Sequence, residues 1–176
     1  MVSLNNGFDK EFRKIYEKHF TLIFRIALRI TGDTYQAEDI CHEAFIKLYK
    51  RAQLFEDLDQ AKYWLIRVVK NLSYNHEKKM QREKKAFERL HKSSTRPFGP
   101  EEQDYIKQET EKIVQEALSK IPYNFRVVLI LKEYGGLTYK EIGSIIGISE
   151  ANVKIRVYRG RERLEKYIKE QNEYVP

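Results

Sequence analysis

The sequence predicts an all-α protein made of two small helical domains. Only eight glycines and four prolines occur in 176 residues, and so few turn-forming residues favour long helices over many short strands. Apolar residues recur at helical spacing through most of the chain. The segment 93–100 gathers serine, proline and glycine, and it is the best candidate for a flexible linker between the two domains.

The first half of the chain contains the apolar patterns of several amphipathic helices. The pattern over 8–30 indicates one or two helices. Either Asp33 or Thr34 is placed to cap the next helix, which is predicted over 35–55. A third helix has an apolar stripe over 61–72, with residues three and four positions apart.

The second half predicts four further helices, over 106–121, 125–134, 139–146 and 150–168. The apolar run 127–131 has the composition of a buried strand. No partner strand is evident elsewhere in the sequence, so a helix is the better interpretation.

The positive charge is concentrated in two blocks. The formal net charge is +7 and the pI is about 9.3. Segment 62–92 carries a net +7 and segment 154–176 carries +3, whereas the rest of the chain is slightly acidic. Separated basic blocks are typical of a protein that binds a polyanion. The alternative is that they are solvated helix faces that bind nothing.

The strongest local signal lies between residues 137 and 156. Thr138 and Glu141 have the spacing of a capping box. Gly147 can supply a left-handed turn residue, and Ser149 can cap the following helix. Two helices joined by such a short turn form a helix-turn-helix motif. The alternative is an ordinary helical hairpin with a basic face toward solvent.

In a helix-turn-helix, the second helix enters the major groove of DNA. Val153, Val157 and Leu164 are spaced to face the core. The outward face then carries side chains suited to base and phosphate contacts, namely Asn152, Lys154, Ile155, Arg156, Tyr158 and Arg159.

The segment 62–75 interleaves aromatic, amide and cationic side chains. Single-stranded DNA is bound by this mixture, because cations follow the phosphates while rings stack on unpaired bases. Trp64 lies on the apolar stripe and is assigned to the core. Arg67, Lys70 and Asn71 lie toward the polar face and are candidate strand contacts.

Several classes of function are not supported by the sequence. One cysteine cannot form an internal disulfide, which fits the reducing cytoplasm. Residues 1–10 lack the features of a secretory signal, and no apolar run exceeds five residues, so no membrane insertion is expected. The four histidines lack metal-ligand spacing. Nucleotide-binding and nucleophile motifs are missing from the sequence. We therefore expect no metal, no cofactor and no enzymatic activity.

Motifs in both halves carry a family resemblance. In the first half they are Thr31-Gly32-Asp33, Ala37-Glu38-Asp39-Ile40, Glu43-Ala44-Phe45-Ile46 and Trp64-Leu65-Ile66-Arg67 with Asn71. In the second half they are Ile121-Pro122, Arg126-Val127-Val128-Leu129, Gly136-Leu137-Thr138-Tyr139-Lys140-Glu141-Ile142 and the segment 153–161. With these motifs in this order, the chain resembles an extracytoplasmic-function (ECF) sigma factor of the sigma-70 family.

The resemblance implies a domain organisation and a set of partners. Residues 1–83 would form sigma region 2, residues 84–104 a linker, and residues 105–176 sigma region 4. The protein would be a cytoplasmic transcription initiation factor. It would bind core RNA polymerase through the β′ clamp helices and the β flap, and it would bind promoter DNA. An anti-sigma factor would be its regulator.

The resemblance also implies three groups of site residues. The −35 element would be read by region 4, with Lys132 as a phosphate contact besides the outward residues 152, 154–156, 158 and 159. The clamp helices would be bound by Ala37, Glu38, Asp39, Ile40, His42, Glu43 and Phe45. The opened −10 element would be held by Phe55, Lys62, Tyr63, Arg67, Lys70, Asn71, Tyr74, Asn75, Lys78 and Lys79.

Two alternatives from other functional classes remain open. A conventional helix-turn-helix repressor or activator would dimerise through the first half and bind duplex DNA unaided. A helical interaction protein would use the basic blocks for acidic partners or RNA, and its function would tolerate loss of Lys154 and Arg159.

Overall fold

The structure, a computed structural model, describes residues 6–51, 55, 57–90 and 105–172. Within these ranges it contains seven helices and no strand, which confirms the predicted all-α class. The helices are α1 (Asn6–Thr31), α2 (Thr34–Lys50), α3 (Leu58–Leu90), α4 (Tyr105–Lys120), α5 (Tyr123–Glu133), α6 (Tyr139–Ile146) and α7 (Glu150–Asn172). The segment 93–100, predicted as the linker, lies outside the described residues.

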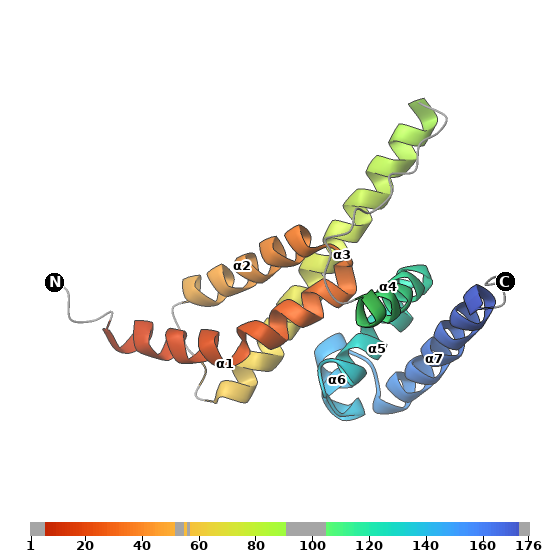
Figure 1. Cartoon of the computed structure of the whole chain (residues 1–176). Coiled ribbons are helices and arrows are strands. Elements are labelled where there is room, and N and C mark those ends of the chain that lie inside the picture. The colour runs from red at the N-terminus through yellow and green to blue at the C-terminus, as the bar shows by residue number, and fades with distance from the viewer. Residues whose placement is uncertain (1–5, 52–54, 56, 91–104, 173–176) are drawn as a thin grey trace.

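α1 and α2 form a helical hairpin (Figure 1). Gly32 joins them with a φ of 71°, a left-handed conformation that costs glycine little. Asp33 caps α2, because its Oδ1 accepts a hydrogen bond from the Gln36 amide at 2.9 Å. α2 ends at Lys50, earlier than the predicted end at residue 55.

Aromatic side chains hold this hairpin together. Rings of Phe12, Tyr16 and Phe20 on α1 surround Phe45 of α2, with centroids 6.4, 4.8 and 6.0 Å from it. Such tilted and edge-on pairs add stability beyond the area they bury. The apolar pattern over 8–30 belongs to one long helix rather than two, because α1 runs without a break from Asn6 to Thr31.

Cys41 lies in this core with no exposed surface, and burial raises the pKa of its thiol to about 12. The thiolate is the reactive form of cysteine. We therefore expect iodoacetamide at pH 8 to alkylate the folded protein at least about 100-fold more slowly than the urea-unfolded protein. Mass spectrometry of quenched samples would measure both rates. Equal rates would show that the α1–α2 core opens readily.

α3 is the longest helix, and it is anchored at its start. His19 of α1, 3% exposed, donates from Nε2 to the Leu58 carbonyl at 3.0 Å. Burial lowers the pKa of His19, which favours its neutral form. The helix continues to Leu90, so the predicted domain boundary at residue 83 falls inside a continuous helix, and the end of α3 projects from the rest of the molecule (Figure 1).

The second half packs around α5. The apolar run 127–131 lies in this helix and is at most 3% exposed, so it is helical as predicted. α7 crosses α5 at Gly160, where a Cβ atom would lie 2.9 Å from the Leu129 side chain and 3.3 Å from the Phe125 carbonyl oxygen. The absence of a side chain at Gly160 permits this close approach.

The two halves of the chain lie against each other (Figure 1). Gln115 of α4 donates to the Arg29 carbonyl of α1 at 3.2 Å. The Arg29 guanidinium lies 3.8 Å from Glu111 and 4.7 Å from the ring centroid of Tyr134. The sequence predicted two halves but did not predict that they pack together.

Candidate nucleic-acid interface

α6 and α7 form the predicted helix-turn-helix, and its start is held by a capping box. The Thr138 hydroxyl accepts from the Glu141 amide at 3.2 Å, and the Glu141 carboxylate accepts from the Thr138 amide at 2.7 Å. Each group satisfies an amide at the helix start that has no partner within the helix. A hydrogen bond from Tyr63 is the largest cause that lowers the pKa of Glu141, and the two bonds with Thr138 lower it further.

The turn between the two helices is also the predicted one. Gly147 ends α6 with a φ of 77°, and the Ser149 hydroxyl accepts from the Asn152 amide at 3.2 Å. Gly143 lies where a Cβ atom would be only 2.6 Å from the Ile148 carbonyl oxygen. The turn can therefore fold tightly against α6 because residue 143 has no side chain.

Val153 and Val157 are buried in the core as predicted, and Leu164 is half-buried. The opposite face of α7 is open to solvent. Arg156 is half-buried, and the exposed residues are Asn152, Lys154, Ile155, Tyr158 and Arg159. This face presents cations, an amide and an aromatic ring over the first turns of the helix, where major-groove contacts are made.

Lys132 lies behind this face. Its ammonium donates to the Leu137 carbonyl at 3.2 Å and lies 4.8 Å from the ring centroid of Tyr139. Lys154 also approaches the ring of Tyr139, at 5.7 Å, and forms an ion pair with Glu150 at 2.9 Å. Lys132 therefore already has a bond within the protein, whereas Lys154 is held only by contacts at the surface.

The candidate single-strand residues of α3 differ in how they relate to the second half of the chain. Asn71, Asn75, Lys78 and Lys79 are exposed. Lys62 is half-buried, and its charge helps to lower the pKa of Glu141 in α6. Four others contact the second half of the chain, and these are Tyr63, Arg67, Lys70 and Tyr74. The resemblance grouped all nine residues. In the structure Lys70 contacts the second half only through its backbone carbonyl, and Arg67 and Tyr74 remain exposed despite their contacts.

Trp64 is half-buried and packs against the core, in agreement with its assignment. The ring of Phe55, the tenth candidate, lies 6.0 Å from the Trp64 ring. The guanidinium of Arg51 covers both rings, at 4.3 Å from Phe55 and 5.5 Å from Trp64. Arg51 and Phe55, which follow α2 in the chain, therefore lie against Trp64 of α3.

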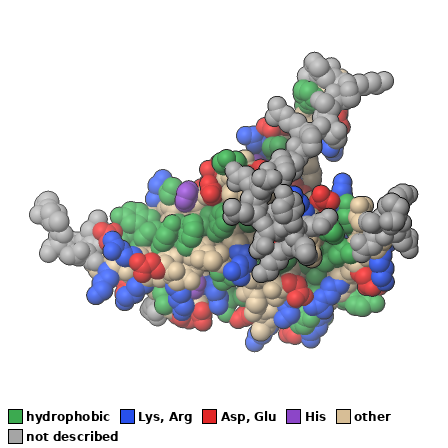
Figure 2. Space-filling view, viewed as in Figure 1, with side chains coloured by type: hydrophobic (Ala, Val, Ile, Leu, Met, Phe, Trp, Pro, Cys, Tyr) green, Lys and Arg blue, Asp and Glu red, His purple; other side chains and the backbone are tan. Residues whose placement is uncertain are grey.

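The candidate polymerase-binding residues of α2 are of two kinds. Ala37, Ile40 and Phe45 are at most 5% exposed and hold α2 to its neighbours. Glu38, Asp39, His42 and Glu43 are exposed. Three apolar residues of the same helix are also exposed, Tyr35, Ile46 and Tyr49, and none of them was among the candidate contacts from the sequence. Figure 2 shows hydrophobic side chains gathered over α1 and α2.

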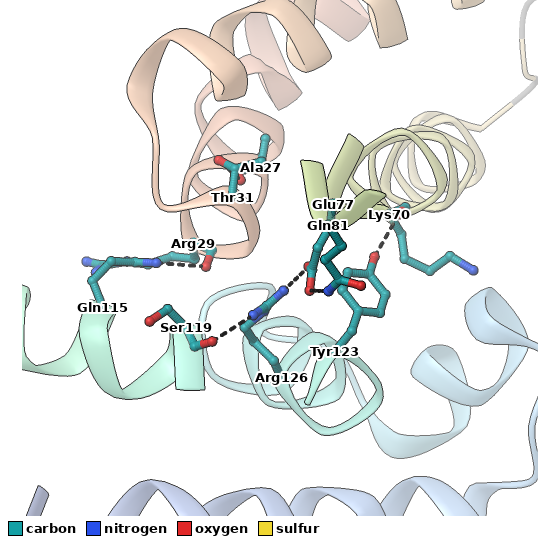
Figure 3. Close-up of polar contacts among 10 residues, drawn as sticks. All are labelled: Ala27, Arg29, Thr31, Lys70, Glu77, Gln81, Gln115, Ser119, Tyr123 and Arg126. Atoms are coloured by element: carbon teal, nitrogen blue, oxygen red, sulfur yellow. Dashed lines mark hydrogen bonds and ion pairs between the residues drawn. The ribbon is translucent and has the colours of Figure 1, made fainter. Parts of the chain in front are cut away.

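Sequence reasoning also missed a polar contact between the halves. Arg126 of α5 is 6% exposed and forms an ion pair with Glu77 of α3 (Figure 3). Tyr123 of α5 donates from its hydroxyl to the Lys70 carbonyl at 2.7 Å. Burial raises the pKa of Tyr123, so it remains a donor at neutral pH. Glu77 follows Tyr63, Arg67, Lys70 and Tyr74 at alternating steps of four and three, a pattern visible in the sequence.

The described residues provide no grouping of three or more His, Cys, Asp or Glu side chains that could hold a metal ion. None of the described helices has the length and apolar content needed to cross a membrane. The candidate binding surfaces on the described residues are the outward face of α7, the polar faces of α3 and the exposed face of α2.

Comparison with known proteins gives a consistent result. The chain matches sigma-70 region 2 over residues 15–83 and sigma-70 region 4 over residues 111–164. It is 30% identical over 154 residues to the ECF RNA polymerase sigma factor SigM of Bacillus subtilis, covering 86% of this chain and 91% of that protein. It is 28% identical over 175 residues to SigW of the same organism, covering 95% and 94%.

Two further matches differ in what they cover. The chain is 28% identical over 160 residues to SigE of Mycolicibacterium smegmatis, which spans 88% of this chain but only 60% of that relative. The sigma factor RpoE of Bartonella quintana, solved with the anti-sigma factor NepR, superposes with a TM-score of 0.68 at 21% identity and covers 91% of this chain and 98% of its own. The similarity to RpoE shows the fold alone. Together with the matches to SigM and to regions 2 and 4, these observations establish that the chain belongs to the ECF sigma factors of the sigma-70 family.

Proposed function

We propose that this protein binds core RNA polymerase and directs it to a small set of promoters. Region 4, α4–α7, reads the −35 element, and region 2, α1–α3, opens the −10 element and holds the separated strand. The observation that carries the proposal is the complete helix-turn-helix with an exposed cationic face, joined to a helix that carries aromatic, amide and cationic side chains. Each surface suits one physical state of DNA.

The −35 surface gains affinity from two kinds of contact. Arg156, Arg159 and Asn152 carry groups that form paired hydrogen bonds to base edges, each worth about 1–3 kcal/mol of discrimination. Lys154 is suited to a phosphate, and such contacts weaken as salt rises. Lys132 is a weaker candidate for phosphate, because its ammonium already donates to the Leu137 carbonyl.

The −10 surface lies along α3. Separating and unstacking a base costs a few kcal/mol, roughly, and capture of the base by stacking and hydrogen bonds offsets this cost. Tyr63 and Tyr74 supply the rings, and Asn71 and Asn75 supply amides. Cations for the phosphates come from Lys62, Arg67, Lys70, Lys78 and Lys79. Phe55 lies near the start of α3.

The exposed face of α2 is the proposed surface for the β′ clamp helices. Glu38, Asp39 and Glu43 give it an acidic character that suits a basic partner, with His42 beside them. Ala37, Ile40 and Phe45 support this face from the core rather than contact the partner.

The β flap is the proposed second site on polymerase, and region 4 would bind it. An anti-sigma factor is the proposed regulator. The catalytic chemistry belongs to the polymerase, and the protein acts in the cytoplasm.

Reconstitution tests this function directly. The purified protein, mixed with core RNA polymerase and fragments of the genome of origin, should yield transcripts with defined start sites. It should also co-migrate with core polymerase in gel filtration. Duplex binding by an unaided dimer at a palindromic site, without transcripts or co-migration, would instead identify a conventional helix-turn-helix regulator.

A further inference from the structure

The end of α3 projects from the rest of the molecule as a continuous helix (Figure 1). Residues 78–90 carry six Lys or Arg and two Glu, which gives this segment a net charge of +4. Every side chain from residue 78 to residue 89 is exposed. The segment therefore presents an excess of positive charge to solvent, outside the packed body of the protein.

Four cations of this segment share one face of the helix, and these are Lys78, Arg82, Lys85 and Arg89. They follow one another at steps of four, three and four, so they fall within roughly 60° of the helix circumference. We call this set the distal stripe.

The acidic side chains of the segment lie off the distal stripe. Glu83 pairs with Lys79, and the two charged groups are 3.9 Å apart. Glu88 pairs with Lys84 at the same distance. No ion pair joins the distal stripe to any other residue that the structure describes. The positive charge of the stripe is therefore not neutralised within the described parts of the chain.

The distal stripe continues the exposed face of the −10 surface. Arg67, Asn71 and Tyr74 are exposed, and they precede Lys78 at steps of four, three and four. Lys78 belongs to both sets, and its ammonium lies 4.6 Å from the ring centroid of Tyr74. Because α3 is unbroken from Leu58 to Leu90, a DNA chain that follows the −10 surface toward the end of α3 meets the distal stripe next.

The chemistry of this face changes along the helix. Over residues 67–78 it combines a ring, an amide and cations, the mixture that holds unpaired bases. From residue 78 to residue 89 it offers cations only, and Phe87 lies on the opposite side of the helix, roughly 180° from Lys78. Cations of this kind contact phosphates. The bases of paired DNA are stacked inside the duplex, so the distal stripe suits paired rather than separated DNA.

The length of the distal stripe also fits a duplex. Lys78 and Arg89 are eleven residues apart, or about 16 Å along the helix axis at 1.5 Å per residue. This length corresponds to about five base-pair steps of roughly 3.4 Å. Neighbouring cations are therefore about 5 Å apart along the axis, close enough for each to reach a different phosphate.

We propose that the distal stripe binds phosphates of the duplex DNA next to the opened −10 element, and so holds the boundary between paired and separated DNA. This inference rests on the proposed function and extends it to residues outside the −10 surface. The match to sigma-70 region 2 ends at residue 83, so Lys85 and Arg89 lie beyond it. The contact adds affinity that depends on salt but not on sequence.

Lys85→Ala tests the proposal, with Lys84→Ala as its matched control. The two lysines are adjacent and exposed, and each change removes one positive charge, but Lys84 lies off the distal stripe. A triple variant replaces Arg82, Lys85 and Arg89 with alanine and leaves the −10 surface intact. Alanine is a strong helix former, so circular dichroism should show the wild-type helix content in each variant.

The measurements use holoenzyme assembled with core RNA polymerase and DNA from a promoter found by reconstitution. A fluorescent bubble probe has a single-stranded −10 element between two duplex arms of about ten base pairs, or roughly 34 Å each, without the −35 element. Two fork probes each lack one of these arms. Anisotropy at several salt concentrations gives the affinity for each probe and its salt dependence.

We expect Lys85→Ala to bind the bubble at least about threefold more weakly than Lys84→Ala at about 0.1 M salt, and the triple variant at least about 20-fold more weakly. The slope of log K against log salt concentration should decrease in magnitude by about one for Lys85→Ala and by about three for the triple variant. One fork should show the same losses as the bubble. The other fork lacks the contacted arm and should show none.

Three results would overturn the proposal. Equal affinities of Lys85→Ala and Lys84→Ala for the bubble would show that the distal stripe is only a solvated face. Equal losses on both forks would place the contact on the separated strand. Weaker co-migration of the triple variant with core polymerase in gel filtration would assign the stripe to the polymerase.

Failure of this inference is distinguishable from failure of the proposed function. If wild-type holoenzyme transcribes and binds the bubble while Lys85→Ala matches Lys84→Ala, only the role of the distal stripe is excluded. If wild-type protein yields neither transcripts nor bubble binding, the proposed function fails and the inference fails with it.

Discussion

Replacing Lys154 and Arg159 together with alanine is expected to remove most promoter-specific transcription. Both side chains are exposed on the outward face of α7. Loss of one base contact and one phosphate contact should weaken −35 duplex binding by about 2–4 kcal/mol, or roughly 30- to 700-fold. Titration of a labelled duplex at several salt concentrations measures this loss. The slope of log K against log salt concentration should decrease in magnitude by about one, because one phosphate contact is lost.

The control is a second pair on the same helix. Lys166→Ala with Lys169→Ala removes the same two positive charges from later turns of α7, where the lysines pair with Glu170 and Glu165. We expect this variant to bind within about threefold of wild type, since exposed pairs of this kind contribute little. Equal losses from the two double variants would show that general attraction to DNA, and not the face at 154–159, accounts for binding.

Gly143→Ala is expected to destabilise region 4 and to displace the recognition helix. Alanine should favour a helix interior by about 1 kcal/mol over glycine. At position 143, however, its Cβ would lie 2.6 Å from the Ile148 carbonyl oxygen, which is backbone and can move only with the turn. We expect a net loss of about 1–3 kcal/mol in the free energy of unfolding. Urea unfolding followed by circular dichroism would measure it.

Gly7→Ala is the matched substitution, since a Cβ there would have no atom within 4 Å and Gly7 also lies in a helix. It should leave the free energy of unfolding unchanged or raise it by up to about 1 kcal/mol. The Gly143 variant should also bind the −35 duplex more weakly, because the turn positions α7. A Gly143→Ala protein as stable as Gly7→Ala would contradict the close approach seen in the structure.

The helix-turn-helix shows how far local signals reach. Thr138, Glu141 and Ser149 act on amides three residues away, so their spacing in the sequence specified each bond before the fold was known. The outward face of α7 followed from the burial of Val153 and Val157 at helical spacing. For this part of the candidate site, the sequence was sufficient.

The first half shows where such reasoning stops. Resemblance placed Ala37, Ile40 and Phe45 among the partner contacts, whereas the structure buries all three. A family motif records which residues recur along a helix, but it does not separate those that hold the helix in place from those that meet the partner. That distinction requires the neighbouring helices.

Helix content, the order of the elements, the capping box of α6 and the cationic face of α7 were determined by the sequence, since each depends on residues within about one or two helical turns. Only the tertiary structure decided that one face of α3, at residues 63, 67, 70, 74 and 77, meets region 4. Its contacts join residues 49 to 78 positions apart. A tyrosine, an arginine or a glutamate on a polar helix face has the same local pattern whether it faces water, DNA or another helix, because the free energy of each arrangement depends on the group it meets and not on its own neighbours in the chain.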